Sequence, residues 1–490
     1  MAPSNRVSDD GLVPAALALA ALALCGCAVG PDYKRPDVSV PAGFNEQAPP
    51  GAWKHAQPSD GVLRGKWWEL FGDPQLDALE EKVAVSNQTL KAATGQYLAA
   101  LDQIRVARAA YFPTLGVGPA VSRIRLSENQ PNTLRGTTNF NYNIFALQGQ
   151  AQWEPDLWGQ VRRTVEQARA DAQASAADLA NVALSLHAEL AADYFQLRGL
   201  DTQKLLFDTT LASDADELAL ARLRLRGGVA NAVDVTQAET QYRTVKAQRI
   251  DVGVARAQFE HAIATLIGVP AESFSLAPSP LEGKLPVVPA GMPSALLERR
   301  PDVAAAERRL AAANAQIGIA VAAYYPNITL SAAGGLESGS LASLLQLPSL
   351  FWSLGASAFE TLFDAGRRHA LTDQARDLYE AQAATYRQSV LNAFQEVEDN
   401  LAALRILEEE AEAQAAAVDA ARQSLALSNK RYKGGVTTYL EVLTAQTIQL
   451  SNERAQADVS TRRFTASVQL VRALGGGWTA GQSTTTTSGH

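Results

Sequence analysis

The sequence predicts an α+β fold that is built from a duplicated unit, in which very long coiled-coil helices are joined to short strands. Three observations carry this prediction. Two proline-free stretches are long enough for exceptional helices, four motifs recur in the same order in the two halves, and each half contains segments in which apolar and polar residues alternate.

The distribution of proline predicts the long helices. Residues 156–269 contain no proline, and none follows Pro348. Proline breaks helix interiors, and Ala, Leu, Glu, Gln and Arg, which dominate both stretches, favour helices. Each stretch has one glycine pair near its middle, Gly227–Gly228 and Gly434–Gly435, so each is expected to form a helical hairpin. A helix of ~70 residues extends roughly 100 Å, a length that suits a device bridging a wide gap.

Heptad spacing indicates that these helices pack as coiled coils. In the second stretch, apolar residues follow the alternating three-four step from Val390 to Leu425. In the first, leucines stand seven apart, as at Leu211, Leu218 and Leu225. Such a repeat predicts a narrow seam that is buried against another helix.

An internal duplication relates the two halves of the chain. Four motifs match in collinear order: Ala109–Thr114 with Ala322–Asn327, Leu157–Arg163 with Leu362–Arg368, Arg226–Val229 with Lys433–Val436, and Leu266–Gly268 with Leu474–Gly476. With two copies, this is a gene duplication and not a solenoid.

The duplication sets the expected domain organisation. The first repeat covers residues 76–269 and the second covers residues 301–478. Residues 27–75 precede them, a proline-rich linker at 270–300 separates them, and the tail at 479–490 is expected to be disordered.

Each repeat contains the period-two alternation of strands. In the first, Phe140, Tyr142 and Ile144 alternate with asparagines, and Gln148–Glu154 places polar residues opposite Gly149, Ala151 and Trp153. In the second, the alternation runs over 327–332 and 352–358. One apolar and one small polar face fit strands with lipid on one side and water on the other, although a soluble half-buried sheet gives the same pattern. Residues 127–138 and 337–350 would be hairpin loops.

The N-terminus resembles a bacterial lipoprotein signal. The apolar run Leu12–Leu24 is too short for a comfortable transmembrane helix, and it leads directly into Cys27, with Gly26 before it and Leu24 three positions before it. Residues 1–26 are therefore the expected signal peptide, and Cys27 the lipidated residue of the mature chain. The alternative is an ordinary signal peptide with incidental cysteines.

The strand count requires more than one copy of the chain. With the signal peptide removed, a membrane crossing has to be made by strands. Two strands per repeat give four per chain, whereas the smallest outer-membrane barrels need about eight. Two copies would supply eight strands and three copies twelve, and only the larger barrel leaves an aqueous lumen.

At this point the chain resembles a known family. Cys27–Pro36, Trp67–Trp68 with Phe71–Leu76, and Glu298–Val303 are similar to motifs of the outer-membrane efflux factors of the TolC/OprM/NodT type. The Tyr-aromatic-Pro elements, the Gly-Gly-Val turns and the Leu-Gly-Gly-Gly-Trp ending at Trp478 are similar as well. The similarity extends from Cys27 to Trp478.

The resemblance implies a homotrimer with one twelve-stranded β-barrel in the outer membrane. The long helices would form a hollow periplasmic α-barrel closed at its tip, and segments 28–75 and 270–300 together with the C-terminus would form a belt around it. The protein would be a lipid-anchored, passive duct that exports small molecules such as drugs or other toxic compounds. Its partners would be outer-membrane lipid, a periplasmic adaptor protein and an inner-membrane efflux pump. The exported substrate is not written in the sequence.

The resemblance also assigns the glycine turns to adaptor docking, although a plain turn would use the same glycines. The docking residues would be Arg226, Gly227, Gly228, Val229, Lys433, Gly434, Gly435 and Val436.

The lining of the tip departs from the family pattern. Thr444 stands where close relatives carry an aspartate ring, and Thr447 stands where they carry a basic residue. Asp234 and Glu441 could supply acidic rings instead, which would attract cations. The alternatives are a solvated helix face or a salt bridge between subunits.

Composition and motifs give no support to other functional classes. The net charge of -8 disfavours nucleic acid as a partner. The histidines lack metal-ligand spacing, and no catalytic constellation is present, so neither an enzyme nor a cofactor is expected beyond the covalent lipid on Cys27. The alternative function is a structural or adaptor lipoprotein whose coiled coils span the envelope without a pore.

Overall fold

The computed structural model describes residues 28–38, 41, 43–44, 46, 65–125, 127, 141–286, 288 and 299–476. Cys27, the tail and the greater part of the 127–138 loop lie outside these residues. The chain divides into two compact units, and each takes material from both repeats. We call them the strand unit (1–36, 98–174 and 307–385) and the hairpin unit (37–97, 175–306 and 386–490).

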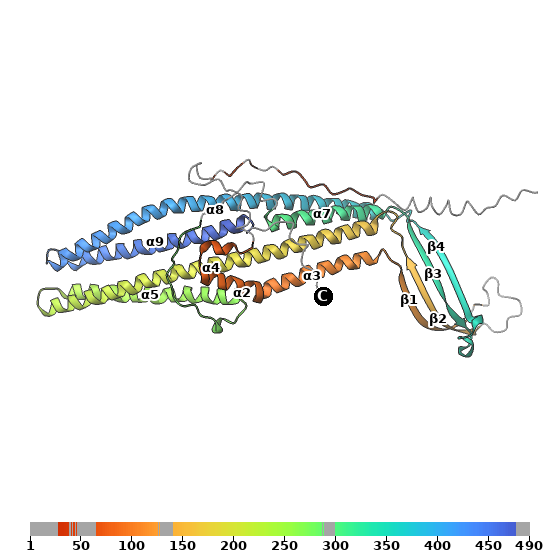
Figure 1. Cartoon of the computed structure of the whole chain (residues 1–490), viewed down its shortest axis with the longest axis horizontal. Coiled ribbons are helices and arrows are strands. Elements are labelled where there is room, and N and C mark those ends of the chain that lie inside the picture. Colours follow the sequence, from red (N-terminus) through yellow and green to blue (C-terminus); the bar gives the residue numbers. More distant parts are fainter. Residues whose placement is uncertain are drawn as a thin grey trace, which may run out of the picture. The chain divides into compact units, whose positions relative to one another are not determined.

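The strand unit contains one antiparallel four-stranded sheet (Figure 1). Its strands are β1 (Thr114–Arg125), β2 (Asn141–Trp153), β3 (Asn327–Ser338) and β4 (Leu350–Phe359), and they pair in chain order. The expected number of strands is confirmed. Alternation does not reveal β1, because glycine and alanine occupy one of its faces at 116, 118 and 120.

The hairpin between β3 and β4 is more ordered than a plain loop. It contains two short 3-10 helices, η4 (Leu341–Ser343) and η5 (Leu347–Ser349). Ser340 caps the first through its hydroxyl. The predicted loop at 337–350 is correct to within two residues, because β3 continues to Ser338.

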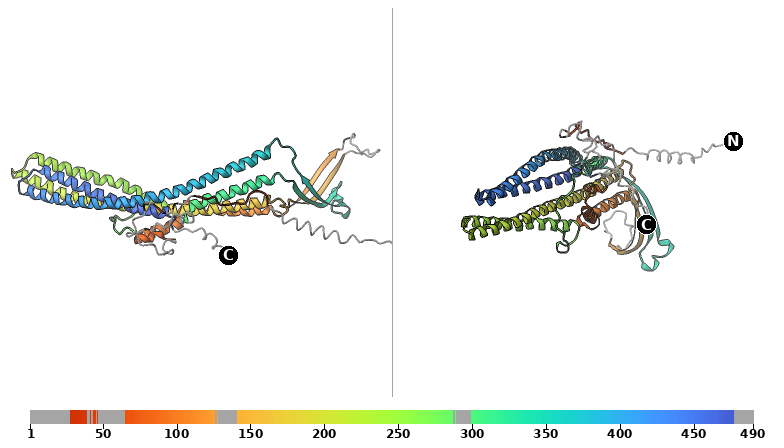
Figure 2. Two further views of the ribbon diagram at one scale, coloured as in Figure 1. Left: turned by 90° about the horizontal axis from the view of Figure 1, so that it is seen from above. Right: turned by 60° about the vertical axis from the view of Figure 1, so that its left-hand side comes forward.

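The long helices form two hairpins of equal dimensions (Figures 1 and 2). In the first, α4 (Gln160–Arg226) has 67 residues and α5 (Ala232–Leu266) has 35. In the second, α8 (Arg367–Lys433) and α9 (Tyr439–Ala473) have the same two lengths. This equality is the structural expression of the duplication. Within the described residues, none of the helices combines the length and the apolar character that crossing a bilayer requires.

The predicted heptad seam is buried in the second stretch, and in the first it is buried at Leu218 (7% exposed) but not at Leu225, which is 38% exposed near the turn. Val390 and Val397 are fully covered, and Leu401 is 4% exposed. Farther along the hairpin unit, Phe207 of α4, Val245 of α5 and Leu450 of α9 share one apolar cluster. The hairpins are therefore in contact with each other along α9 through apolar packing.

The main core of the hairpin unit forms around the shorter helices that precede the strands of the first repeat. These are η2 (Trp67–Phe71), α2 (Pro74–Ser86) and α3 (Gln88–Ala109), which continues into the strand unit. Asp73 caps α2 by accepting hydrogen bonds from the backbone of Gln75 and Leu76, and its other oxygen accepts from the Tyr194 hydroxyl at 2.5 Å. The motif Phe71–Leu76 thus joins α2 to α4.

A buried pair lies beside this core. Glu80 is fully buried, and its carboxyl lies 2.7 Å from Nδ1 of His187, whose ring stacks on Trp68. Burial raises the pKa of Glu80 and lowers the pKa of His187. Both shifts favour a protonated, neutral Glu80 beside a neutral His187.

The proline-rich linker is fixed to the helices by one carboxylate. Asp201, 1% exposed in its side chain, binds Arg198 at 3.0 Å and Arg256 at 2.6 Å, and it accepts from the backbone of Ser279. The two arginines donate in turn to the carbonyls of Ala277 and Leu276. After η3 (Ala271–Ser273), the linker is therefore held against α4 and α5. The first helix of the second repeat, α7 (Pro301–Ala322), follows the linker.

Asp201→Asn should lower the free energy of unfolding of the detergent-solubilised protein by about 3 kcal/mol, because the buried Arg198 loses its carboxylate partner and Arg256 keeps only Glu260. Urea unfolding followed by circular dichroism measures this. The matched control is Asp208→Asn, whose pair with Arg249 is 41% and 38% exposed and should change stability by less than ~1 kcal/mol. Equal effects of the two variants would contradict the role given to Asp201.

Candidate functional site

The sheet of the strand unit has one apolar face. Directly paired residues point to the same side of a sheet, and the register places the large apolar side chains together. They are Leu115, Val117, Val121, Phe145, Leu147, Trp153, Ile328, Leu330, Leu336, Leu350, Trp352 and Leu354. At the C-terminal end of β1, the same face carries Arg123 and Arg125, and the apolar band ends there.

The opposite face is polar and corrects one interpretation of the sequence. It carries Gln148, Gln150 and Gln152 of β2 together with serines and a threonine of β3 and β4. Tyr142 and Ile144 lie on this polar face, not on the apolar face as their alternation suggested. The two alternating segments of the first repeat both belong to the strand β2. Their apolar residues point to opposite faces of the sheet, because the apolar band ends between the two segments.

The sheet has two open edges. β1 pairs only with β2, and β4 pairs only with β3, within the part of the chain that the structure describes. Each edge strand has at least ten residues. Backbone groups along such edges need partners, and lipid cannot provide them.

The segment that follows Cys27 is fixed to the strand unit by Arg163. This side chain is 4% exposed, donates to the carbonyls of Val29 and Gly30, and binds Asp32 at 2.9 Å and Glu166 at 2.7 Å. Gly30 adopts a φ of 91° close to α7, where an added Cβ would lie 2.4 Å from the Cα of Gly318. Sequence reasoning missed this anchor, because nothing in the sequence shows that Arg163 faces inward.

Two further basic residues at the beginning of the long helices bind acids of the same chain. Arg162 binds Asp156 at 3.2 Å, and Arg368 binds Asp364 at 2.8 Å. Basic residues in the first turn of a helix oppose the helix dipole, and a carboxylate of the same chain offsets the charge of each of these two arginines.

The two hairpin turns at the helical tip have identical geometry. Gly228 and Gly435 both have a φ of 74°, and the amides of Val229 and Val436 bond to carbonyls five residues earlier. This is the Schellman ending of a helix, in which the residue with positive φ favours glycine. Only the second glycine of each pair meets this requirement. Both valines are about 70% exposed, beside the exposed Arg226 and Lys433.

Behind the turns, the two hairpins are joined by polar contacts. Arg224 of α4 donates to the carbonyl of Tyr432 at 2.9 Å, and its guanidinium lies 4.5 Å from the centre of that ring. The hydroxyl of Tyr439 donates to Glu217 at 3.3 Å. Tyr432 and Tyr439 pack edge-to-face in the same apolar cluster.

The candidate aperture residues lie on α5 and α9, and the single chain does not bring them into one cluster. Thr444 and Thr447 are exposed, and their hydroxyls donate at 2.8 Å to the carbonyls of Leu440 and Leu443. Glu441 lies 3.5 Å from Arg431 of α8, and both side chains are about half exposed. Asp234 is half-buried in the first turn of α5. Their role as aperture lining stays a prediction.

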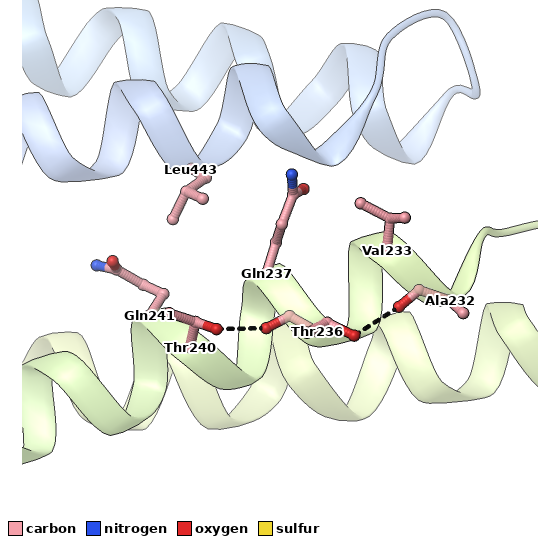
Figure 3. A pocket seen from close by; sticks show the side chains of 7 residues that line it. All are labelled: Ala232, Val233, Thr236, Gln237, Thr240, Gln241 and Leu443. Atoms are coloured by element: carbon pink, nitrogen blue, oxygen red, sulfur yellow. Dashed lines mark hydrogen bonds between the residues drawn. The ribbon is translucent and has the colours of Figure 1, made fainter.

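A shallow pocket lies between α5 and α9 close to the turns (Figure 3). Its volume is about 410 Å³. The hydroxyls of Thr236 and Thr240 point along α5 and donate to backbone carbonyls, so their methyl groups are left for contact. The lining residues are Ala232, Val233, Thr236, Gln237, Thr240, Gln241 and Leu443.

Comparison with known proteins identifies the class. The family model described as outer membrane efflux protein matches residues 79–269 and 292–476. The probable efflux pump outer membrane protein TtgC of Pseudomonas putida is 32% identical over 465 residues, which cover 94% of this chain and 95% of that protein. The pyoverdine export outer membrane protein OpmQ of Pseudomonas aeruginosa is 32% identical, over 88% of this chain and 92% of that protein.

Solved structures share the fold. The outer-membrane channel OprN superposes with a TM-score of 0.85 at 30% identity, over 92% of this chain and 100% of that chain. The open state of the MtrE outer membrane channel of Neisseria gonorrhoeae superposes with a TM-score of 0.80 at 29% identity, over 92% of this chain and 98% of that chain.

A two-faced sheet joined to long helical hairpins thus defines an outer-membrane channel protein that extends into the periplasm. The chain belongs to the outer membrane efflux protein family. Its fold is the α+β duplicated fold of these channels, and its function is that of the outer-membrane channel of a tripartite efflux pump. The homologues are channels and not enzymes.

The assignment of the two faces predicts opposite tolerance for charge at adjacent positions of β4. Leu354→Arg places a cation on the apolar face and should destabilise the inserted protein by about 2–4 kcal/mol. Ser353→Arg places the same charge on the polar face and should be tolerated. Urea unfolding in lipid vesicles measures both variants, and a larger loss for Ser353→Arg would invert the face assignment.

Proposed function

We propose that three copies of the chain close one twelve-stranded barrel and form a passive export duct. The open edges of the sheet carry this proposal. An amphipathic four-stranded sheet with unpaired edges is unsuited to lipid as a single copy. Three copies pair β1 of one chain with β4 of the next, enclose the polar faces around water, and present the apolar faces to lipid.

The proposed partners are a periplasmic adaptor protein and an inner-membrane pump, which supplies the energy. The two Schellman turns support docking at the tip, because they present the same exposed pair of a basic residue and a valine in both hairpins. The proposed cargo is a drug or another toxic small molecule. Relatives are described as exporting toluene, an antibiotic or pyoverdine. The chain itself carries no catalytic role in this proposal.

The covalent lipid on Cys27 is also proposed. Two features support it. One is the lipoprotein signal that ends at Cys27, and the other is the clamp that Arg163 forms by donating hydrogen bonds to the carbonyls of Val29 and Gly30. Such a clamp would hold the anchor at a constant distance from the base of the strands.

The purified protein with Cys27→Ser should form trimers in detergent and small, cation-selective channels in a planar bilayer. Glu441→Ala and Asp234→Ala, measured separately, should each reduce the cation selectivity if these carboxylates line the aperture. The control is Asp419→Ala, an exposed acid of α8 next to Arg422.

A folded trimer without channel activity would contradict the duct and favour the bridging lipoprotein without a pore. Unchanged selectivity in both variants would leave the duct intact but remove Glu441 and Asp234 from its lining.

A further inference from the structure

One buried pair near the helical tip is not explained by adaptor docking or by the aperture. Asp214 of α4 is 1% exposed and Gln446 of α9 is 3% exposed. The side-chain amide of Gln446 donates to Oδ1 of Asp214. The remaining oxygens, Oδ2 of Asp214 and Oε1 of Gln446, are both buried and have no hydrogen-bond partner among the described residues. Buried polar atoms without a partner are uncommon and costly.

A single proton would give both of these oxygens a hydrogen-bond partner. A neutral carboxylic acid and a primary amide can exchange two hydrogen bonds in a ring, because each offers one donor and one acceptor. With a proton on Oδ2, Asp214 donates to Oε1 of Gln446 while it accepts from the amide nitrogen. An ionised Asp214 has no hydrogen to give, and both Oδ2 of Asp214 and Oε1 of Gln446 then lack a donor among the described residues.

The surroundings favour the protonated form. The acid whose charge acts on Asp214 is Glu217 of the same helix, which accepts a hydrogen bond from Tyr439 of α9 and interacts with Asn429 and Lys433 of α8. The α5 residues packed in the adjoining cluster, Val235 and Ala238, are apolar. Burial, followed by the charge of Glu217, raises the pKa of Asp214 to about 7.

We propose that Asp214 and Gln446 form a proton-dependent clasp that holds the two helical hairpins together near the tip. When Asp214 is protonated, two hydrogen bonds join α4 to α9. When it ionises, one of them is lost and a buried charge is left between the hairpins. The clasp lies within one chain and does not depend on the assembly proposed above.

The direction of the pH effect follows from linkage. In a separated state, Asp214 would meet water and titrate near its ordinary pKa of about 3.9. Its pKa in the clasped state is raised, so protonation favours the clasped state. The stabilisation is complete below about pH 4 and is lost as the pH rises through about 7.

Hydrogen exchange of the full-length, detergent-solubilised protein at pH 5 and pH 8 tests the clasp. After correction for intrinsic exchange rates, the amides around 210–218 and 442–450 should open more often at pH 8 in the wild type, on the order of 10-fold or more. Asp214→Asn replaces the acid by an amide that can still exchange two hydrogen bonds with Gln446 but cannot titrate. Protection in this variant should be the same at both pH values.

Asp216→Asn is the matched control, because Asp216 is exposed on the same helix and its loss should leave the pH effect unchanged. The proposal is wrong if Asp214→Asn keeps the pH dependence of the wild type, or if the wild type shows none. Should Asp214→Asn fail to fold, Gln446→Leu provides a second test. It removes both hydrogen bonds of the clasp, so at pH 5 the same amides should open more often than in the wild type, and unchanged protection at pH 5 would contradict the clasp.

Discussion

The need to pair every backbone group in lipid governs the structure of the strand unit. A sheet of four strands leaves the hydrogen-bonding groups of β1 and β4 open on one side. In water such edges would be a risk of aggregation, and in lipid they are excluded. The faces add a second constraint, because one carries an apolar band and the other carries glutamine and serine. Closure with further copies satisfies both constraints at once.

The hairpin unit meets a different requirement, which is to keep very long helices in register. Apolar seams supply the general attraction, as at Phe207, Val245 and Leu450. Polar contacts then fix particular positions: Asp201 holds the linker, Arg224 holds the carbonyl of Tyr432, and Asp214 holds Gln446. The contact between Asp214 and Gln446 depends on a proton, whereas the contact between Arg224 and Tyr432 does not. The tip therefore combines a constant link with one that varies with pH.

Periodicity made the architecture predictable from the sequence, whereas the inward-facing polar contacts were not. Proline-free stretches, heptads and glycine pairs predicted the hairpins, since each is a local signal. β1 escaped detection because its second face is glycine and alanine, and Tyr142 was assigned to the wrong face because the alternation changes phase within β2. Arg163, Asp201 and Asp214 each have a partner that is distant in sequence, and residue type alone cannot show that a charged side chain is buried.

Pairing of the edge strands between copies is the central claim, and disulfide trapping tests it most directly. In a background without Cys25 and Cys27, one cysteine on β1 at Gly118 is combined in turn with one on β4 at Ser353, Gly355 or Ser357. Oxidation of the membrane-inserted protein should give a covalent species at the matching register that stops at three chains. Folded protein that stays uncrosslinked at every register, or that forms a ladder beyond three chains, would contradict the closed trimeric barrel.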